Sequence, residues 1–319
     1  MFRALLIASA LTVSMTAAVK IEKIQYRGWP NCYRISNGEA DLIVTTDVGP
    51  RIIRYGFVGG QNLFKEFDAQ IGKSGESAWQ PRGGHRLWMA PEDPVLTYAL
   101  DNSPVRYERK DDTVVLTGAI EKETGLQKQI VVKLAPTGTA VEIVHRITNL
   151  ARQPREFAIW ALTMMAQGGS GIVAFPPRGK HPDILLPTNP LVMWAFTDFS
   201  DPRWKFTQKY LILCQDPKIA APQKTGLFNR NTVAAYLLGS DLFIKKSSAA
   251  DARKQPDFGC SYETFTNNEF LEMETLGELS TVAPGQTLEH VEHWSLHKGI
   301  KIPSWNDTGI DAALARLIR

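Results

Sequence analysis

The chain from about residue 20 onward consists of short apolar runs separated by Gly, Asn, Asp and Pro. The runs are rich in Val, Ile, Leu and Thr, a composition that favours β-strands. Between two of them, Pro136-Thr137-Gly138 is a strong turn signal and predicts a hairpin. On this basis we predict strands at 40–46, 51–57, 113–119, 128–134, 140–147, 157–165, 210–213, 233–238, 242–245, 270–276 and 289–296.

Helical periodicity is convincing only near the C-terminus, over 307–318. There Asp307 or Thr308 is the candidate cap of an Ala-Leu-Ile stripe that ends in basic residues. No fixed-period repeat is evident, which disfavours propellers and solenoids. The sequence therefore predicts an all-β protein with a single β domain over 19–300 and a short helical tail over 301–319.

The least regular part of the chain is 168–204, which is rich in proline. A long irregular excursion from a β scaffold serves either as the rim of a binding site or as a packed cover. Both interpretations stay open at this point.

The first residues have the pattern of a targeting segment. A short positive start is followed by an apolar stretch over 4–13 and by small residues at Thr16-Ala17-Ala18. The stretch is too short for a membrane span, and no second long apolar run follows. We therefore expect a signal peptide over 1–18, a mature chain without a membrane span, and a periplasmic or secreted location.

Composition and charge exclude several classes. The chain has 36 basic and 33 acidic residues without a basic block, so no nucleic-acid partner is expected. No phosphate-binding loop, dinucleotide fingerprint or nucleophile elbow is present, and no cofactor is expected. The cysteines, Cys32, Cys214 and Cys260, allow one disulfide or three unpaired thiols, and their wide separation argues against a zinc site.

The segment from Arg82 to Asp93 carries the densest candidate chemistry. It combines two glycines with Arg82, His85, Arg86, Trp88 and Glu92. Adjacent glycines let a backbone approach a ligand closely, arginine supplies a fork of donors, and tryptophan supplies a flat apolar face. The segment is either a binding segment or an arginine-rich connection between strands.

A second candidate is the pair Glu272 and Glu274. On a strand these two side chains share one face, opposite Leu271, Met273 and Thr275. When two carboxylates lie this close together, the pKa of at least one of them is raised, which suits general acid or base catalysis. The alternative is a solvated edge strand.

Histidines in the last predicted strand offer a weaker signal. His290 and Glu292 fall on one face with Trp294, but His290 and His293 point to opposite faces. The spacing also does not match the helical zinc-protease motif. No metal site is expected.

Taken together, these motifs resemble the galactose-mutarotase-like superfamily of aldose and hexose-phosphate epimerases. Arg82-Gly83-Gly84 followed by Trp88 is similar to a segment of the hexose-6-phosphate epimerase branch. Ile147-Thr148-Asn149 before a proline-containing turn, and Met273-Glu274-Thr275 before Ala283-Pro284-Gly285, resemble two further family motifs in the same order. The resemblance covers nearly all of 20–298.

The resemblance implies a large β-sandwich with its site on the concave face of a sheet. It implies that Glu274 takes the proton of the anomeric hydroxyl and that Arg82 and His85 contact the sugar. Where the family has its acid histidine, this chain has Thr163, which does not donate protons near neutral pH. That departure is more similar to an exported bacterial branch without an assigned activity.

We therefore expect a carbohydrate ligand, bound or processed over the concave sheet. The alternatives are an active aldose-1-epimerase-like enzyme with a replaced acid, an oligosaccharide lyase or hydrolase, and a non-catalytic envelope interaction module. The oligomeric state stays open. The predicted catalytic residues are Glu274 and His85, and the predicted sugar contacts are Arg82, Arg86, Trp88, Glu92, Trp160 and Glu272.

Overall fold

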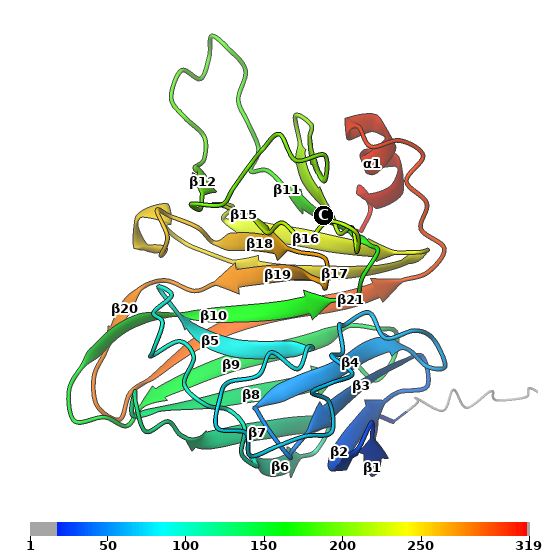
Figure 1. Ribbon diagram of the computed structural model, residues 1–319. Helices are drawn as coiled ribbons and strands as arrows, with labels where there is room; N and C mark the ends of the chain where they lie inside the picture. The colour runs from blue at the N-terminus through cyan, green and yellow to red at the C-terminus, as the bar shows by residue number, and fades with distance from the viewer. Residues whose placement is uncertain (1–17, 318–319) are drawn as a thin grey trace, which may run out of the picture.

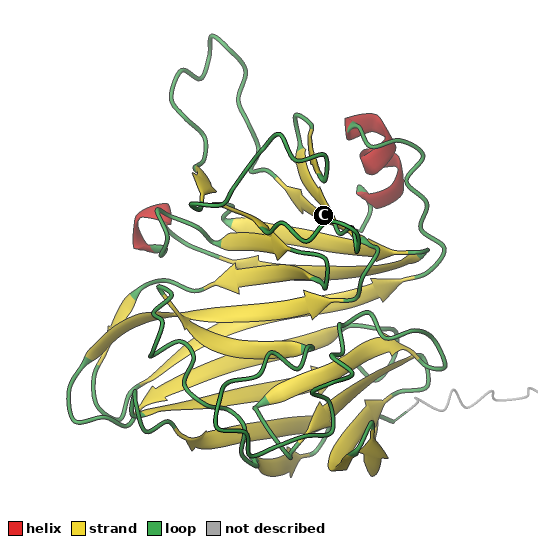
Figure 2. Cartoon of the chain, in the orientation of Figure 1, coloured by secondary structure: helices red, strands yellow, loops and turns green. Residues whose placement is uncertain are grey.

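The computed structural model describes residues 18–317, so the predicted signal peptide lies outside the described residues except for Ala18. Two large antiparallel sheets face one another, and helical structure among residues 18–317 is confined to two short segments (Figures 1 and 2). The fold is that of a large β-sandwich, as the sequence predicts. Within the described part, no helix is long and apolar enough to cross a membrane.

The first sheet has eleven strands, with β20 (Ser280–Val282) pairing to one end of β10 beside a continuous path. The path runs β1 (Lys20–Tyr26), β2 (Trp29–Ser36), β3 (Ala40–Thr45), β4 (Arg51–Phe57), β5 (His85–Ala90), β10 (Arg155–Met165), β19 (Leu271–Leu276), β18 (Tyr262–Thr266), β15 (Gln223–Leu227) and β12 (Leu191–Met193).

The second sheet has ten strands and packs against the first. Its order is β13 (Trp204–Phe206), β14 (Tyr210–Cys214), β11 (Ser170–Ala174), β16 (Asn231–Leu238), β17 (Asp241–Ser248), β21 (Thr287–His297), β9 (Val141–Asn149), β8 (Leu126–Leu134), β7 (Thr113–Ile120) and β6 (Arg106–Lys110).

The main core fills the space between the two sheets. Alternation along the strands sends one side chain inward and the next outward. In the centre of the first sheet, Leu87, Ile159 and Met273 join this core. The opposite face of the same strands is also covered, since Trp88, Trp160 and Leu162 are buried in a separate cluster. The central strands of the first sheet are thus covered on both faces, by the main core on the inner face and by this separate cluster on the outer face.

Two short helical elements complete the described fold, η1 (Ala252–Lys254) and α1 (Asp307–Leu314). The predicted C-terminal helix is present, but its N-cap is Asn306, whose side chain accepts a hydrogen bond from the Gly309 amide at 2.9 Å, and not Asp307 or Thr308. Asparagine is among the preferred N-cap residues because its short side chain reaches the free amides of the first turn.

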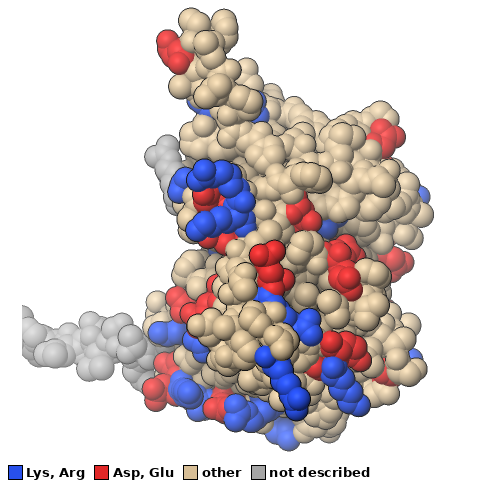
Figure 3. Space-filling view, turned by 90° about the vertical axis from the view of Figure 1, so that its left-hand side faces the viewer, with Lys and Arg blue, Asp and Glu red and all other residues tan. Residues whose placement is uncertain are grey.

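All the predicted strands are present, with ends shifted by a few residues. The important difference is at 85–90, which the sequence left as a binding segment or a connection. This stretch is β5, a central strand with every residue buried. Cys32, Cys214 and Cys260 are unpaired thiols. On the face shown in Figure 3, acidic and basic side chains lie interspersed.

Candidate functional site

Neighbouring strands of the first sheet, β5, β10, β19, β18 and β15, form the floor of the candidate site. The strand register aligns their outward side chains. Leu162 of β10 is paired with Arg86 of β5 on one side and with Glu274 of β19 on the other. Two residues earlier on β10, Trp160 is paired with Trp88 of β5. Charged and aromatic side chains from distant parts of the sequence therefore converge on one patch.

A cleft of about 400 Å³ lies over this floor. Its walls come from loops: Trp79 belongs to 58–84, Tyr98 to 91–105, and Trp194 follows β12 directly. Flat aromatic faces with polar groups between them suit a ligand that is apolar on one face and hydroxylated at its edges. The lining residues are Trp79, Pro81, Arg86, Trp88, Glu92, Tyr98, Trp160, Leu162, Met164, Trp194, Phe196, Lys224, Phe265, Phe270, Glu272 and Glu274.

Glu274 is the buried acid of the floor, and it is held by one of its two oxygens. The indole nitrogen of Trp160 donates to Oε2 at 2.8 Å, and Lys224 Nζ donates to the same oxygen at 3.2 Å. Lys224 also pairs with Glu263 at 2.7 Å and lies 4.6 Å from the ring centroids of both Trp160 and Trp194. Burial lowers the pKa of Lys224, but the carboxylates of Glu274 and Glu263 outweigh this and raise it, so the lysine stays charged.

Glu272 is the second acid of the floor. Its carboxylate lies 3.0 Å from Nη1 of Arg86, whose guanidinium carbon is 4.2 Å from the ring centroid of Trp88 and 5.2 Å from that of Trp79. Burial raises the pKa of Glu272 to about 7. The pairing with Arg86 opposes this rise, and the negative charge of Glu274 adds to it. Near neutral pH this group therefore exchanges a proton readily.

The cleft contains most of the predicted site residues. Glu92 lies at its exposed rim and accepts a hydrogen bond from the hydroxyl of Tyr98 at 2.6 Å. The sequence-based expectation that Glu272 and Glu274 share a face agrees with the geometry, and both are buried in a central strand instead of a solvated edge. Their roles as ligand contacts stay predictions. The predicted site residues found in the cleft are Arg86, Trp88, Glu92, Trp160, Glu272 and Glu274.

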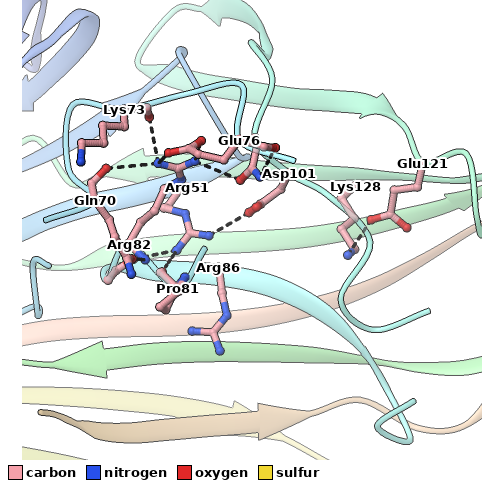
Figure 4. A network of polar contacts seen from close by, with 12 residues as sticks. Arg51, Gln70, Lys73, Glu76, Pro81, Arg82, Arg86, Asp101, Glu121 and Lys128 are labelled. Carbon is pink, nitrogen blue, oxygen red and sulfur yellow. Dashed lines mark hydrogen bonds and ion pairs between the residues drawn. The ribbon is translucent and has the colours of Figure 1, made fainter. Parts of the chain in front are cut away.

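Arg82 does not reach the cleft, which corrects the sequence-based grouping. Its side chain is fully buried, and Nη1 donates to the carbonyls of Gln70 at 3.2 Å and Lys73 at 2.8 Å. Nη2 donates to Asn102 at 3.0 Å and pairs with Glu76. In Figure 4 the guanidinium of Arg82 lies among these groups, whereas that of Arg86 points away from them. Arg82 therefore holds together the two loops, 58–84 and 91–105, that carry Trp79 and Tyr98.

The two glycines after Arg82 belong to the same turn and pack closely against other backbone segments, outside the cleft lining. A Cβ on Gly83 would lie 1.9 Å from the carbonyl oxygen of Lys65, and Gly83 has a φ of 91°. Only glycine fits where the backbone takes this conformation so close to another chain segment. Arg51 closes the turn from below by donating to the carbonyls of Pro81 at 2.6 Å and Gly83 at 2.8 Å.

His85 also lies outside the cleft, because it points to the interior between the sheets. Its Nε2 is 2.6 Å from Nε2 of His145, and its Nδ1 is 2.8 Å from the hydroxyl of Thr163. His145 Nδ1 is 3.0 Å from the carbonyl of His290, which can only accept, so this nitrogen carries the proton. The remaining bonds then run from Thr163 to His85 and from His85 to His145. Burial lowers the pKa of both imidazoles, which are neutral.

A buried carboxylate continues this polar network. Glu292 pairs with Lys245 at 2.9 Å, accepts from the indole of Trp294 at 2.7 Å and accepts from the hydroxyl of Thr275. Lys245 also donates to the carbonyl oxygen of Met273 at 3.0 Å. The network therefore joins the second sheet to the strands that carry the cleft floor.

His85, His145 and Glu292 are the described residues that come closest to a metal site, since their ligand atoms lie within 4.8 Å of one another. All three are fully buried. Their lone pairs are already engaged by the hydrogen bonds above, and Lys245 Nζ lies 2.9 Å from the carboxylate of Glu292. These three side chains therefore have hydrogen-bond partners within the protein without a metal ion.

Thr163, which stands where the family has its acid histidine, does not face the cleft either. Thr163 points inward to His85, and its neighbour Leu162 is the residue of this stretch that lines the cleft. Leucine cannot donate a proton. If the cleft contains an acid, the group must come from another strand, and Glu272 is the candidate with a suitable pKa.

Sequence reasoning missed the walls and the central cation. Trp79, Tyr98 and Trp194 lie in irregular segments without a recognisable motif, and Lys224 is an isolated lysine in the sequence. The proline-rich excursion supplied the only signal, because its downstream end carries Trp194 and Phe196 into the cleft. Its middle projects from the body between β11 and β12 (Figure 1), with Leu185 and Leu186 exposed.

Comparisons of sequence find no relative: no family model matches the chain, and no curated protein matches it. Comparisons of structure do find similar folds. A galactose mutarotase-like protein from Lactobacillus casei aligns with a TM-score of 0.55 at 11% identity, over 84% of this chain and 100% of its own. A galactose mutarotase-like protein from Clostridium acetobutylicum aligns with a TM-score of 0.52 at 9% identity, over 88% and 99%.

A third structure, from Klebsiella pneumoniae, whose assignment as an aldose 1-epimerase is provisional, aligns with a TM-score of 0.58 at 14% identity. The alignment covers 93% of this chain and 86% of that one. At such low identity the likeness concerns the backbone alone. Two facing antiparallel sheets, matched over nearly the whole chain by these structures, show that the protein has the galactose-mutarotase-like fold.

Proposed function

We propose that the protein binds a carbohydrate in the aromatic cleft, with the sugar ring over β5, β10 and β19. One observation carries the proposal. Among residues 18–317, Oε1 of the buried Glu274 has no hydrogen-bond partner, although Trp160 and Lys224 fix the other oxygen. A buried carboxylate oxygen without a donor is costly, and a sugar hydroxyl supplies that donor.

The walls support the same ligand class. Trp79 and Tyr98 of the walls pack with Trp88 of β5 around one end of the cleft, with ring centroids 4.8 to 5.4 Å apart. The contacts of Tyr98 are edge to face, and the two indoles are tilted against each other. Such rigid aromatic surfaces bury the C–H face of a pyranose while its hydroxyls reach the charged floor. The names of the structural neighbours point to sugars too, but one fold hosts many activities.

A second candidate function is anomer exchange, and the pKa of Glu272 favours it. In this reaction Glu274 takes the proton of the anomeric hydroxyl while Glu272 gives a proton to the ring oxygen. The bond between the anomeric carbon and the ring oxygen breaks, and an open-chain aldehyde forms. Closure on the other face of the carbonyl returns both protons. Glu272, with a pKa of about 7, replaces the inward-pointing His85 as the acid.

Titration calorimetry with a panel of aldoses tests binding. We expect wild-type protein to bind at least one of them, and Glu274→Gln to bind it at least about tenfold more weakly. Glu289→Gln is the matched control, because Glu289 is an exposed residue of the other sheet. Equal binding by wild type and Glu274→Gln contradicts the proposal.

Polarimetry on the same sugars separates binding from anomer exchange. Accelerated exchange that disappears in both Glu274→Gln and Glu272→Gln supports the enzyme. Binding without acceleration across the panel supports a binding protein.

We further propose that the protein is exported, on the strength of its first 18 residues. Mass analysis of the chain recovered from cell fractions tests this. Export predicts a mature N-terminus near Val19 in the periplasmic or extracellular fraction, and an intact Met1 in the cytoplasmic fraction alone contradicts it.

A further inference from the structure

The charged groups around the cleft are unequal in number. Glu92, Glu272 and Glu274 line it, and only Arg86 and Lys224 oppose them. Two more acids neighbour the floor: Glu263 on β18, which is paired with Glu274 across the two strands, and Asp257 in the loop before β18, whose charge interacts with those of Glu274 and Glu92. Together with the hydroxyl of Tyr98, these are the titratable groups of the described chain that line the cleft or adjoin its floor.

Both cations are already committed. Lys224 lies between Glu263 and Glu274, at 2.7 Å and 3.2 Å, and against two indole rings. Arg86 pairs with Glu272, and its guanidinium packs on Trp88. A ligand phosphate or carboxylate would have to compete with these carboxylates for each cation, at a cost of buried like-charge repulsion.

The two floor carboxylates line the same cleft from one face of β19. Glu272 and Glu274 are two residues apart on one face, so their Cα atoms are about 7 Å apart. Glu272 pairs with Arg86 of β5, and Oε2 of Glu274 is held by Lys224 of β15 and by the indole of Trp160 on β10. In the described chain, Oε1 of Glu274 keeps no protein donor. A donor group placed here meets two acceptors.

The pKa values of these acids reflect the same excess of carboxylates over cations. Burial raises the pKa of Glu272 to about 7, and it raises the pKa values of Glu263 and Asp257 as well. The neighbouring carboxylate Glu274 contributes in the same direction for all three. A cation bound over the floor relieves this repulsion.

We propose that the preferred ligand is an aldose that carries a protonated amine, with the ammonium bound between Glu272 and Glu274. The inference rests on the proposed function and narrows it. Neutral aldoses fill the same space but supply only hydroxyl donors, and N-acetylated, phosphorylated or acidic sugars lack the positive charge.

Titration calorimetry at pH 6, where the amine is protonated, tests the preference. The probes are glucosamine, galactosamine and mannosamine, each beside its neutral parent and its N-acetyl form, with glucuronate and glucose 6-phosphate as anionic sugars. We expect at least one amino sugar to bind about tenfold more tightly than its parent, because a charge-assisted hydrogen bond replaces a neutral one. The N-acetyl form should lose this advantage.

Repeating the titration in two buffers of different ionisation enthalpy counts the protons exchanged. An ammonium beside Glu272 lowers the pKa of that carboxyl, so binding of the amino sugar at pH 6 should release up to about one proton. The neutral parent should release much less. In Glu272→Gln the release should disappear, and the affinity ratio of amino sugar to parent should fall toward one.

The outcomes separate this inference from the proposed function. Neutral sugars that bind as tightly as their amino counterparts, or anionic sugars that bind more tightly, overturn the amine preference and leave carbohydrate binding in place. Absence of binding by every sugar overturns both.

Discussion

Glu274 and Thr275 are neighbours on β19 that point to opposite sides of the first sheet. Glu274 faces the cleft, and Thr275 donates a hydrogen bond to the buried Glu292 of the second sheet. The backbone between Glu272 and Glu274 is held from the same side, since Lys245 donates to the carbonyl of Met273. The strand that carries the two floor acids is therefore fixed from behind by buried polar contacts.

Replacing His85 with alanine should destabilise the fold without removing ligand contacts. The substitution leaves a cavity and deprives Thr163 and His145 of their partner, so we expect the free energy of unfolding to fall by about 2 to 4 kcal/mol. Urea denaturation measures the loss. Thr163→Val, which removes one hydrogen bond, should cost about 1 kcal/mol. An affinity change above about tenfold in folded His85→Ala would assign His85 the site role that its position opposes.

Arg82→Met should loosen the loops of the cleft wall. The variant removes the buried partner of Glu76 and the donors to Gln70, Lys73 and Asn102. We expect a loss of about 3 kcal/mol in the free energy of unfolding, and weaker binding because Trp79 is no longer held. Glu76→Gln keeps the donors to the backbone and should cost about 1 kcal/mol. Limited proteolysis within 67–82 gives an independent readout, and unchanged cleavage there argues against this role.

Lys224→Met should be among the most destabilising single changes in the cleft. It leaves Glu263 and Glu274 as buried carboxylates without their cation. Breaking a buried ion pair in this way costs about 3 to 5 kcal/mol. Adding Glu263→Gln to the variant removes one stranded charge and should restore part of the stability. The double-mutant cycle measures this coupling. Additive effects of the two substitutions would show that the pair does not interact.

Glu272→Gln should change how stability depends on pH. The pKa of Glu272 is about 7 in the folded protein and near 4.5 when unfolded, so the folded state holds the proton more tightly. The stability from this group is fully present below about pH 4.5 and is lost as pH rises through 7. Because glutamine does not titrate, the stability of the variant relative to wild type should rise across this window.

The size of that rise should reach up to about 3 kcal/mol, because each unit of pKa corresponds to about 1.36 kcal/mol. Urea unfolding at several pH values between 4.5 and 8 measures it, with Glu289→Gln as the control for an exposed carboxylate. Parallel stability curves for wild type and Glu272→Gln would show that Glu272 titrates alike in both states.

The strands were readable from the sequence because they combine apolar runs with strong turn signals, as at Pro136-Thr137-Gly138. The shared face of Glu272 and Glu274 followed from strand alternation alone. The segment from Arg82 to Trp88 was misread in part for a physical reason. Its residue types suit a ligand, but alternation in β5 sends Arg86 and Trp88 to the cleft and His85 to the interior.

The walls and the central cation could not be derived in this way. Trp79, Tyr98 and Trp194 come from three irregular segments whose paths depend on long-range contacts, such as those of Arg82. The role of Lys224 as the partner of Glu274 becomes evident only once β15 is known to lie two strands from β19. No local pattern encodes such a neighbour.

Strands supply the charged floor of the cleft, whereas separate loops supply its aromatic walls. Chemical selectivity and ligand size are therefore encoded in different parts of the chain. Insertions or deletions in 58–84, 91–105 or the segment after β12 can widen or narrow the opening while the floor keeps its charges. If the cleft binds saccharides as proposed, such changes alter the length of saccharide that fits, while the floor still selects the same functional group.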